Sequence, residues 1–419
     1  MGWLGVTGRA VYFLAGVLAI LLVAALAVYV SYQRSGVGEG TSNSKTNLTS
    51  TNNSYPNTLE EPSPGTTVNS RPIRQAITPK PVKLVVYTYD DFMAWGEDEE
   101  LFDKLVQRFE NETGIDVVIY RFDGARQMVT QVLNELDQGV ETADVVIGID
   151  PILLQELKKH NAVVCYLSPS APLEVANALD PDHCATPIDY GLIALVYDPS
   201  RLTEEELAML RDGVTLDELV KLAPRIVGED PTKSSTGLNF LLYTMALSRL
   251  EGRDWKELWR QLVGNGMMIA PSWGSAYDEF LREGSPRAIV VSYGTDPAYS
   301  AWYSAKEGGA EEPSVNATVL AAGGKRLGWM QVEGVAIIRG AELDAAKKFV
   351  DWLLSEEVQR EIPASQWMFP AVDVSLPSFY KYALTAKDVD GMANSVLPPD
   401  EIYESLEVWL KDWLSIAGG

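Results

Sequence analysis

The sequence contains only two cysteines, and its basic residues are well outnumbered by its acidic ones. Cys165 and Cys184, 19 positions apart, are too few to build a structural zinc site even with the neighbouring His183. They are consistent with one disulfide of an extracellular protein or with two free thiols. Against 58 Asp and Glu there are 34 Lys and Arg, which gives a net charge of −24.

The negative charge belongs to the part of the chain after residue 80. Residues 1–80 contain six basic and three acidic residues, so residues 81–419 carry a net charge of −27. This excess disfavours nucleic acid and anionic lipid as partners and is compatible with a cationic ligand. A solvated acidic surface would explain the same composition. The apolar content of 46% is that of a folded protein with a sizeable core.

The chain begins with an apolar segment followed by a polar one. Ala10–Val30 contains 21 residues without a charge, enough to span a bilayer. We interpret residues 1–34 as an uncleaved signal anchor rather than a signal peptide cut near Ala27, because the apolar run continues past that point. Residues 35–80 are dominated by Ser, Thr, Asn, Gly and Pro, so they predict a disordered tether. Glycosylation sequons start at Asn47, Asn52, Asn111 and Asn316.

From Pro81 onwards, short apolar runs alternate with helical patterns, which is typical of an α/β fold. Strands are expected at residues 83–88, 117–120, 144–149 and 288–292. Helices are expected at residues 97–111, 126–138, 238–250, 342–361 and 401–416. The extended run 187–197 and the segment 293–299 are expected to cross between two lobes of one domain, residues 81–419.

Aromatic and acidic residues gather where the first predicted strands end. Tyr89 and Asp90 follow the strand at 83–88, and Trp95 comes a few residues later. Ligands of open parallel sheets bind beyond the carboxyl ends of the strands. Two aromatic faces and a carboxylate suit a flat, positively charged organic molecule, although a helix cap and rim aromatics give the same pattern. Asp150, at a second strand end, either caps the next helix or faces the same ligand.

Hydroxyl residues precede the predicted helix at 238–250. Ser234, Ser235 and Thr236 lie there with Lys233 beside them. Free N–H groups and the helix dipole attract anions at such a helix start, and an ordinary Ser or Thr N-cap gives the same sequence. Four further aromatic residues are expected at strand ends or in turns, namely Trp273, Tyr293, Tyr299 and Trp367.

These residues fall in seven segments that, in order and spacing, resemble the thiamine-binding proteins of bacterial and archaeal ABC importers. The segments are VYTYDDF, ADVVIGID, PIDYG with ALVYD, DPTKSSTGL, SWGSAY, VSYGTDPAY and SQWMFP. The resemblance implies a two-lobed, class II periplasmic-binding-protein fold that holds thiamine, or its mono- or diphosphate, between the lobes. It implies an aromatic box of Tyr89, Trp95, Trp273, Tyr293, Tyr299 and Trp367, with Ser234, Ser235 and Thr236 at the phosphate end. This chain departs from the family pattern at Lys233, Thr236, Gly274 and Ser275.

The apolar segment predicts a membrane-anchored protein, and the sequons and the cysteine pair indicate that its binding domain, expected to be a monomer, lies on the extracellular side. The resemblance implies that it has no catalytic residue, metal or cofactor and delivers thiamine to an ABC permease. Asp90 or Asp150 would attract the thiazolium ring. One alternative is a ferric-ion binding protein of the same fold, which usually uses adjacent tyrosines, and the chain has no Tyr-Tyr pair. Another is a thiamine-cleaving transferase, which needs an activated cysteine, and only Cys165 and Cys184 are candidates.

We expect a fragment that starts at Pro81 to fold and bind its ligand alone, because the tether has almost no large apolar side chains with which to pack. The measurement is thermal melting and ligand titration of this fragment beside the full chain. Loss of cooperative melting in the fragment, with melting retained in a longer one, would show that the tether is part of the fold.

Overall fold

The computed structural model describes residues 82–90, 92–140 and 142–418. The expected anchor over residues 1–34 and tether over residues 35–80 lie outside this part of the chain. Within the described residues, no helix is both long and apolar enough to cross a membrane.

The first lobe is built on three parallel strands, β1 (Lys83–Tyr89), β2 (Asp116–Phe122) and β3 (Val145–Ile149). They are followed in turn by helices α2 (Leu101–Thr113), α3 (Ala125–Gln138) and α4 (Pro151–Lys159). Side chains alternate across β1, so Leu84 and Val86 pack with α2, whereas Tyr87 packs with Met128 of α3 on the other face. Both faces of the sheet are therefore covered, as a parallel sheet requires.

The second lobe repeats this arrangement with the parallel strands β7 (Ile226–Glu229), β8 (Met268–Ala270) and β9 (Ile289–Tyr293). Helices α8 (Ser235–Leu250), α9 (Trp255–Gly264), α10 (Trp273–Leu281) and α11 (Asp296–Lys306) surround them. Every residue of α8 from Thr236 to Ser248 is buried. This helix is therefore the centre of the second core, and its amino end lies where β7 ends.

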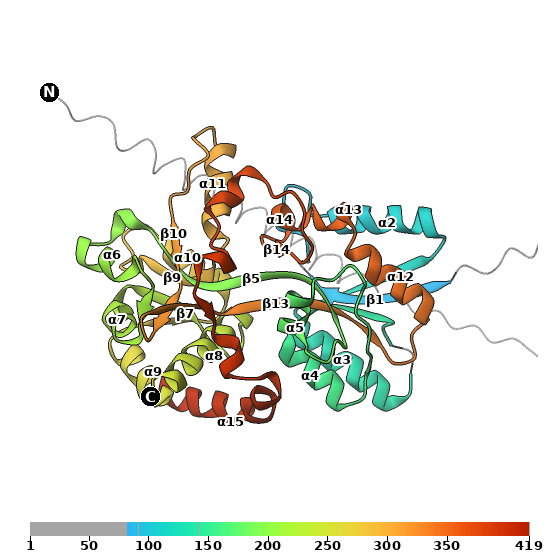
Figure 1. Ribbon diagram of the computed structural model, residues 1–419, viewed down its shortest axis with the longest axis horizontal. Helices are drawn as coiled ribbons and strands as arrows, with labels where there is room; N and C mark the ends of the chain where they lie inside the picture. Colours follow the sequence, from blue (N-terminus) through green and yellow to red (C-terminus); the bar gives the residue numbers. More distant parts are fainter. Residues whose placement is uncertain (1–81, 91, 141, 419) are drawn as a thin grey trace, which may run out of the picture. The chain divides into compact units, whose positions relative to one another are not determined.

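Two long strands, β5 (Thr186–Tyr197) and β13 (Met330–Ile338), join the lobes. They pair with each other antiparallel, and β13 also pairs with β3, while β5 also pairs with β9. The resulting sheet has the order β2-β1-β3-β13-β5-β9-β7-β8, and Figure 1 shows β5 and β13 side by side between the two lobes. The expected crossing at 187–197 lies in β5. Residues 293–299, expected as a second crossing, form the end of β9 and the start of α11, because the returning strand is β13.

Shorter elements complete both lobes. In the first lobe these are β4 (Val163–Val164), α5 (Leu173–Leu179), α12 (Leu343–Leu353), α13 (Glu356–Gln359), α14 (Ile362–Ser365) and β14 (Phe369–Pro370). In the second they are α6 (Glu204–Leu210), α7 (Leu216–Leu222), β10 (Asn316–Thr318) and the sheet β15-β12-β11-β6, with β6 (Val214–Thr215), β11 (Leu320–Ala322), β12 (Lys325–Gly328) and β15 (Gly391–Met392).

The last helix, α15 (Pro399–Ala417), packs against α4 of the first lobe and α9 of the second (Figure 1). Its Trp413 is buried against Trp259 of α9, with ring centroids 5.8 Å apart. On the other side, Lys159 at the end of α4 lies 3.6 Å from Glu404. The helix therefore supports both lobes at once.

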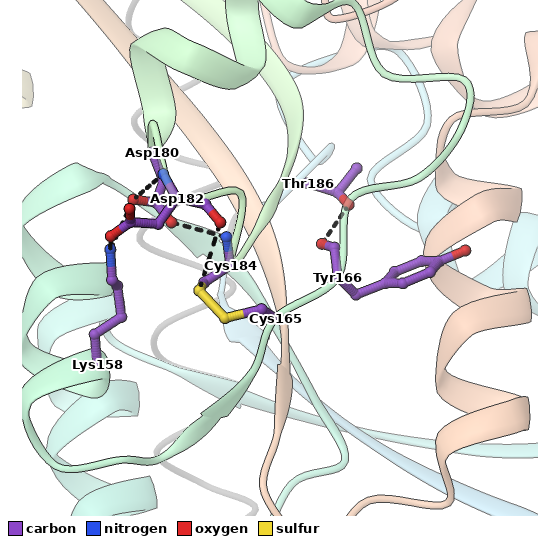
Figure 2. The surroundings of a disulfide bond; sticks show 7 residues. All are labelled: Lys158, Cys165, Tyr166, Asp180, Asp182, Cys184 and Thr186. Carbon is purple, nitrogen blue, oxygen red and sulfur yellow. Dashed lines mark hydrogen bonds and ion pairs between the residues drawn. A yellow bond between two sulfur atoms is a disulfide. The ribbon is translucent and has the colours of Figure 1, made fainter.

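Cys165 and Cys184 are bonded in the structure, which is the outcome expected if the chain is extracellular. The bond joins the segment after β4 to the segment after α5 (Figure 2). The backbone N–H of Cys184 donates to buried Asp180 at 2.8 Å, and Lys158 of α4 forms an ion pair with the same carboxylate at 2.8 Å. The disulfide therefore fixes a loop that already has internal polar contacts.

Replacing both cysteines by serine should lower the free energy of unfolding by about 3 kcal/mol, because the bond closes a loop of 19 residues in the unfolded chain. Urea unfolding of the variant and the wild type measures this difference. An unchanged unfolding midpoint, or two alkylatable thiols in the untreated protein, would contradict the assignment.

Candidate functional site

Tyr89 lies at the end of β1 with its ring against β3. Gly148 of β3 has a φ of +88°, and a Cβ atom there would fall 2.2 Å from the Tyr89 ring, so this position requires glycine. The Tyr89 hydroxyl donates to Oε2 of Glu333 at 2.7 Å and accepts from Nε2 of Gln366 at 2.5 Å. The strand end is therefore connected to β13.

The hydrogen bonds continue along β13 into the second lobe. Gln331 donates to Glu333 over 3.4 Å, and its Oε1 accepts from the hydroxyl of Tyr293 at 3.4 Å. Tyr293 in turn lies 3.2 Å from Oγ1 of Thr236, in the first turn of α8. Three predicted site residues, Tyr89, Tyr293 and Thr236, are thus connected through two residues of a crossing strand that the sequence did not single out.

A second group of predicted residues forms an aromatic cluster. Trp95, from the loop after β1, meets Trp273, the first residue of α10, with ring centroids 5.9 Å apart in an edge-to-face arrangement. Tyr299 of α11 meets Trp367 at 4.9 Å, and Nε1 of Trp367 donates to the backbone oxygen of Trp95 at 3.0 Å. Trp95 is 49% exposed, so this cluster retains accessible aromatic surface.

Local chemistry explains the position of Trp273. Ser272 caps α10 by accepting from the backbone N–H of Ser275, and the helix starts at Trp273 immediately after. The indole Nε1 donates to Ser292 of β9 at 2.9 Å, one residue before Tyr293. Trp273, which follows β8, and Tyr293, which ends β9, therefore lie at the same edge of the sheet, with β7 between their strands.

Two buried carboxyl groups lie at the ends of β7 and β9. Glu229, the last residue of β7, is 2% exposed, and neither of its carboxyl oxygens has a hydrogen-bond partner within the described residues. Asp296, the first residue of α11, is 8% exposed, and its Oδ2 has none. Burial raises the pKa of Asp296 to about 7, against the effect of the nearby Ser292 and Tyr277 hydroxyls. Burial, and then the charge of Asp296, raise the pKa of Glu229.

A third buried acid lies on the crossing strands. Asp189 of β5 is fully buried and faces Glu333 of β13 in the strand register. Burial raises the pKa of Asp189 well above its usual range, and the charge of Glu333 adds to the shift. Acidic side chains therefore lie on β5, β7 and β13 and at the start of α11, which agrees with a cationic ligand.

The structure shows the partners or the exposure of the other predicted acidic and hydroxyl residues. Asp150 caps α4, accepting from the backbone N–H groups of Ile152 and Leu153 at 2.9 and 2.8 Å. Asp90 is exposed in the turn after β1. Ser234 caps α8 by accepting from the N–H of Gly237 at 3.3 Å, and Ser235 is exposed. Lys233 forms an ion pair with Asp230 at 3.1 Å.

Sequence reasoning missed Glu229, Asp296, Gln331 and Glu333. Glu333 had a detectable signal, since it and Gln331 are polar residues inside the apolar run Met330–Ile338. Glu229 and Asp296 precede or begin proline-containing turns, where acidic residues are common for reasons of capping alone.

One cavity of the structure lies elsewhere. It has a volume of about 340 Å³ and is lined by Trp255, Trp409 and the arginines Arg249 and Arg253 among others. Arg249 pairs with Glu401, and Arg253 pairs with Asp217 at 2.8 Å. Its cations are therefore already neutralised, and the predicted residues are absent from its lining.

Two lobes joined by crossing strands, with aromatic side chains from both lobes meeting at strand ends, define a two-lobed ligand-binding protein. The chain belongs to the bacterial extracellular solute-binding protein family, which it matches over residues 86–360. It is 29% identical over 344 residues to the thiamine-binding periplasmic protein of Brucella abortus, an alignment that covers 80% of this chain and 91% of the relative.

Solved structures agree with this family. A periplasmic thiamin-binding protein matches with a TM-score of 0.62 and 25% identity, covering 80% of this chain and 96% of that protein. Iron-bound HitA from Pseudomonas aeruginosa matches with a TM-score of 0.58 and 20% identity, covering 80% and 99%. The second likeness concerns the fold alone.

Its family and its relatives are binding proteins, and this chain is likewise a binding protein and not an enzyme. The thiamine-cleaving alternative needs a cysteine thiolate, and Cys165 and Cys184 are both consumed in the disulfide.

The link between Tyr89 and β13 can be tested by Tyr89→Phe. The variant loses the hydroxyl that bonds to Glu333 and Gln366, so its free energy of unfolding should fall by about 1.5–3 kcal/mol, the range for hydrogen bonds to charged groups. The matched control is Tyr120→Phe at an exposed tyrosine of β2, which should unfold like the wild type. Equal urea midpoints for all three proteins would reject the proposed link.

Proposed function

We propose that this protein captures thiamine outside the cell and delivers it to an ABC permease. The observation that carries the proposal is the meeting of Trp95 from the first lobe with Trp273 from the second, within a cluster that includes Tyr299 and Trp367. Aromatic surfaces supplied by both lobes suit a ligand made of two flat heterocycles. The relatives named for thiamine binding support the same ligand.

The charge of the site supports a cationic ligand. The quadrupole of an aromatic face attracts a cation, and the thiazolium ring of thiamine is permanently charged. The two acids first expected to supply the negative charge, Asp90 and Asp150, are an exposed turn residue and a helix cap. Asp296 and Glu229, buried beside Trp273 and Tyr293, are better placed for this role.

The proposal covers thiamine and its phosphate esters, and the described contacts favour the unphosphorylated form. The residues at the expected phosphate end already have partners. Ser234 caps α8, Thr236 is hydrogen-bonded to Tyr293, and Lys233 forms an ion pair with Asp230. Ser235 remains exposed. Glu229 lies against the amino end of α8. A Cβ atom added to Gly237 in the first turn of this helix would fall 2.7 Å from the backbone oxygen of Glu229. When it is ionised, an acid at this helix end disfavours a bound phosphate.

We further propose that Ala10–Val30 anchors the protein in the cell membrane with residues 81–419 outside, acting as a monomer. The disulfide supports an extracellular location, since such bonds persist in oxidising compartments. Asn111 of α2 and Asn316 of β10 are exposed, as glycosylated residues must be.

Ferric-ion capture is the alternative function, because iron-binding proteins share this fold. The sequence lacks the adjacent tyrosines that such sites usually have. Titration of residues 81–419 with ferric citrate and with thiamine separates the two functions, and iron binding without thiamine binding would reject the proposal.

Trp273→Ala tests the aromatic cluster. Loss of one stacking surface should weaken thiamine binding about tenfold to hundredfold, by analogy with the 1–3 kcal/mol of base stacking, while thermal melting changes less because the indole is only partly buried. Tyr293→Ala should affect both properties, because its ring also packs against the cores of both lobes.

The control for both variants is Tyr120→Ala, on an exposed edge-strand tyrosine outside the cluster. It should bind thiamine like the wild type. If Trp273→Ala melts normally and binds thiamine with unchanged affinity, the aromatic-box assignment at this position is wrong.

A further inference from the structure

Three parallel strand ends bring two buried acids to one place. Residue Ala270 of β8 pairs with Glu229 of β7, and β7 pairs with β9, which leads through Tyr293 to Asp296. The two acids are close enough for the charge of Asp296 to raise the pKa of Glu229. Three of their four carboxyl oxygens are buried without a hydrogen-bond partner among the described residues.

The groups that face Asp296 are acidic or neutral. They are Tyr277 of α10, Ser292 and Tyr293 of β9, Tyr299 of α11 and Glu229 of β7. The basic residues of nearby elements have other partners. Lys306 of α11 lies 3.4 Å from Glu97, and Lys381, in the 3-10 helix packed against α11, lies 3.3 Å from Glu311.

Buried carboxyl oxygens without donors are unfavourable, and a folded protein retains them where they have a use. The position of Asp296 in the first turn of α11 favours a negative charge there through the helix dipole. Among the described residues, no basic side chain is paired with this acid pair, so a cation would be a suitable partner for it. Trp273 and Tyr299, next to this acid pair, belong to the aromatic cluster that would hold the ligand.

We propose that Asp296, with Glu229 behind it, is the counter-ion for the charged ring of the ligand and determines the specificity of the site for a cationic heteroaromatic compound. This inference rests on the proposed binding of thiamine. Asp296 and Glu229 lie outside the predicted aromatic box. In this proposal they are the residues that distinguish a cationic ligand from a neutral one of similar shape.

The ionisation of Asp296 gives the proposal a pH signature. Burial raises the pKa of Asp296 to about 7, so the carboxyl is mostly neutral at pH 6 and mostly charged at pH 8. A bound cation favours the charged form and lowers this pKa. Thiamine affinity should therefore rise about tenfold from pH 6 to pH 8, with release of about half a proton per ligand at pH 7.

The experiment is calorimetric titration of the full-length protein with thiamine at pH 6, 7 and 8, in buffers of different ionisation enthalpy. Wild-type protein should show the rise in affinity and the proton release. Asp296→Asn, which keeps the shape but removes the charge, should bind thiamine about tenfold to hundredfold more weakly at pH 8, and its affinity should change less than that of the wild type between pH 6 and pH 8. Its affinity for the neutral hydroxymethylpyrimidine half of thiamine should be unchanged.

Three outcomes are decisive. Wild-type protein that binds thiamine with equal affinity at all three pH values and without proton release would overturn the inference, whether or not the variant folds. So would Asp296→Asn with wild-type affinity and the same pH profile. Absence of thiamine binding by folded wild-type protein at every pH would instead overturn the proposed function itself.

Discussion

The antiparallel pairing of β5 with β13 is the constraint on which the site depends. These strands join the parallel strands of one lobe to those of the other, and their register sets Glu333 opposite Asp189. Gln331 and Glu333 are two residues apart on one strand, so they share a face and bridge Tyr293 of one lobe to Tyr89 of the other. A slip of one residue would turn both side chains to the opposite face and break the connection between the lobes.

The same arrangement places acidic groups where they oppose folding. Asp189, Glu229 and Asp296 are buried, and burial raises the pKa of each. When the pKa of a carboxyl group is higher in the folded state than in the unfolded state, the free energy of unfolding falls as the pH rises from the unfolded value to the folded value. The large cores around α8 and β1 offset this, and a bound cation would return part of the loss. The site is thus maintained by the packing of both lobes.

Much of this architecture can be read from the sequence because local chemistry determines it. The alternation in β1, the Asp150 cap before Pro151 and the single cysteine pair each report on a local constraint, and each appears in the structure. The aromatic residues Trp95, Trp273, Tyr299 and Trp367 come together because strand ends of an α/β sheet converge. The role of β13 was missed because pairing between distant strands leaves no local pattern. Glu229 and Asp296 were missed because an acidic side chain near the start of a proline-containing turn looks the same whether it caps the turn or is enclosed by other elements.

The most direct test of this account is a crystal structure of residues 81–419 grown with thiamine. The account predicts one thiamine between the lobes, in ring contact with Trp273 and with its thiazolium nearest Asp296. A ligand bound away from the aromatic cluster, or held there with its thiazolium turned away from both Asp296 and Glu229, would contradict it.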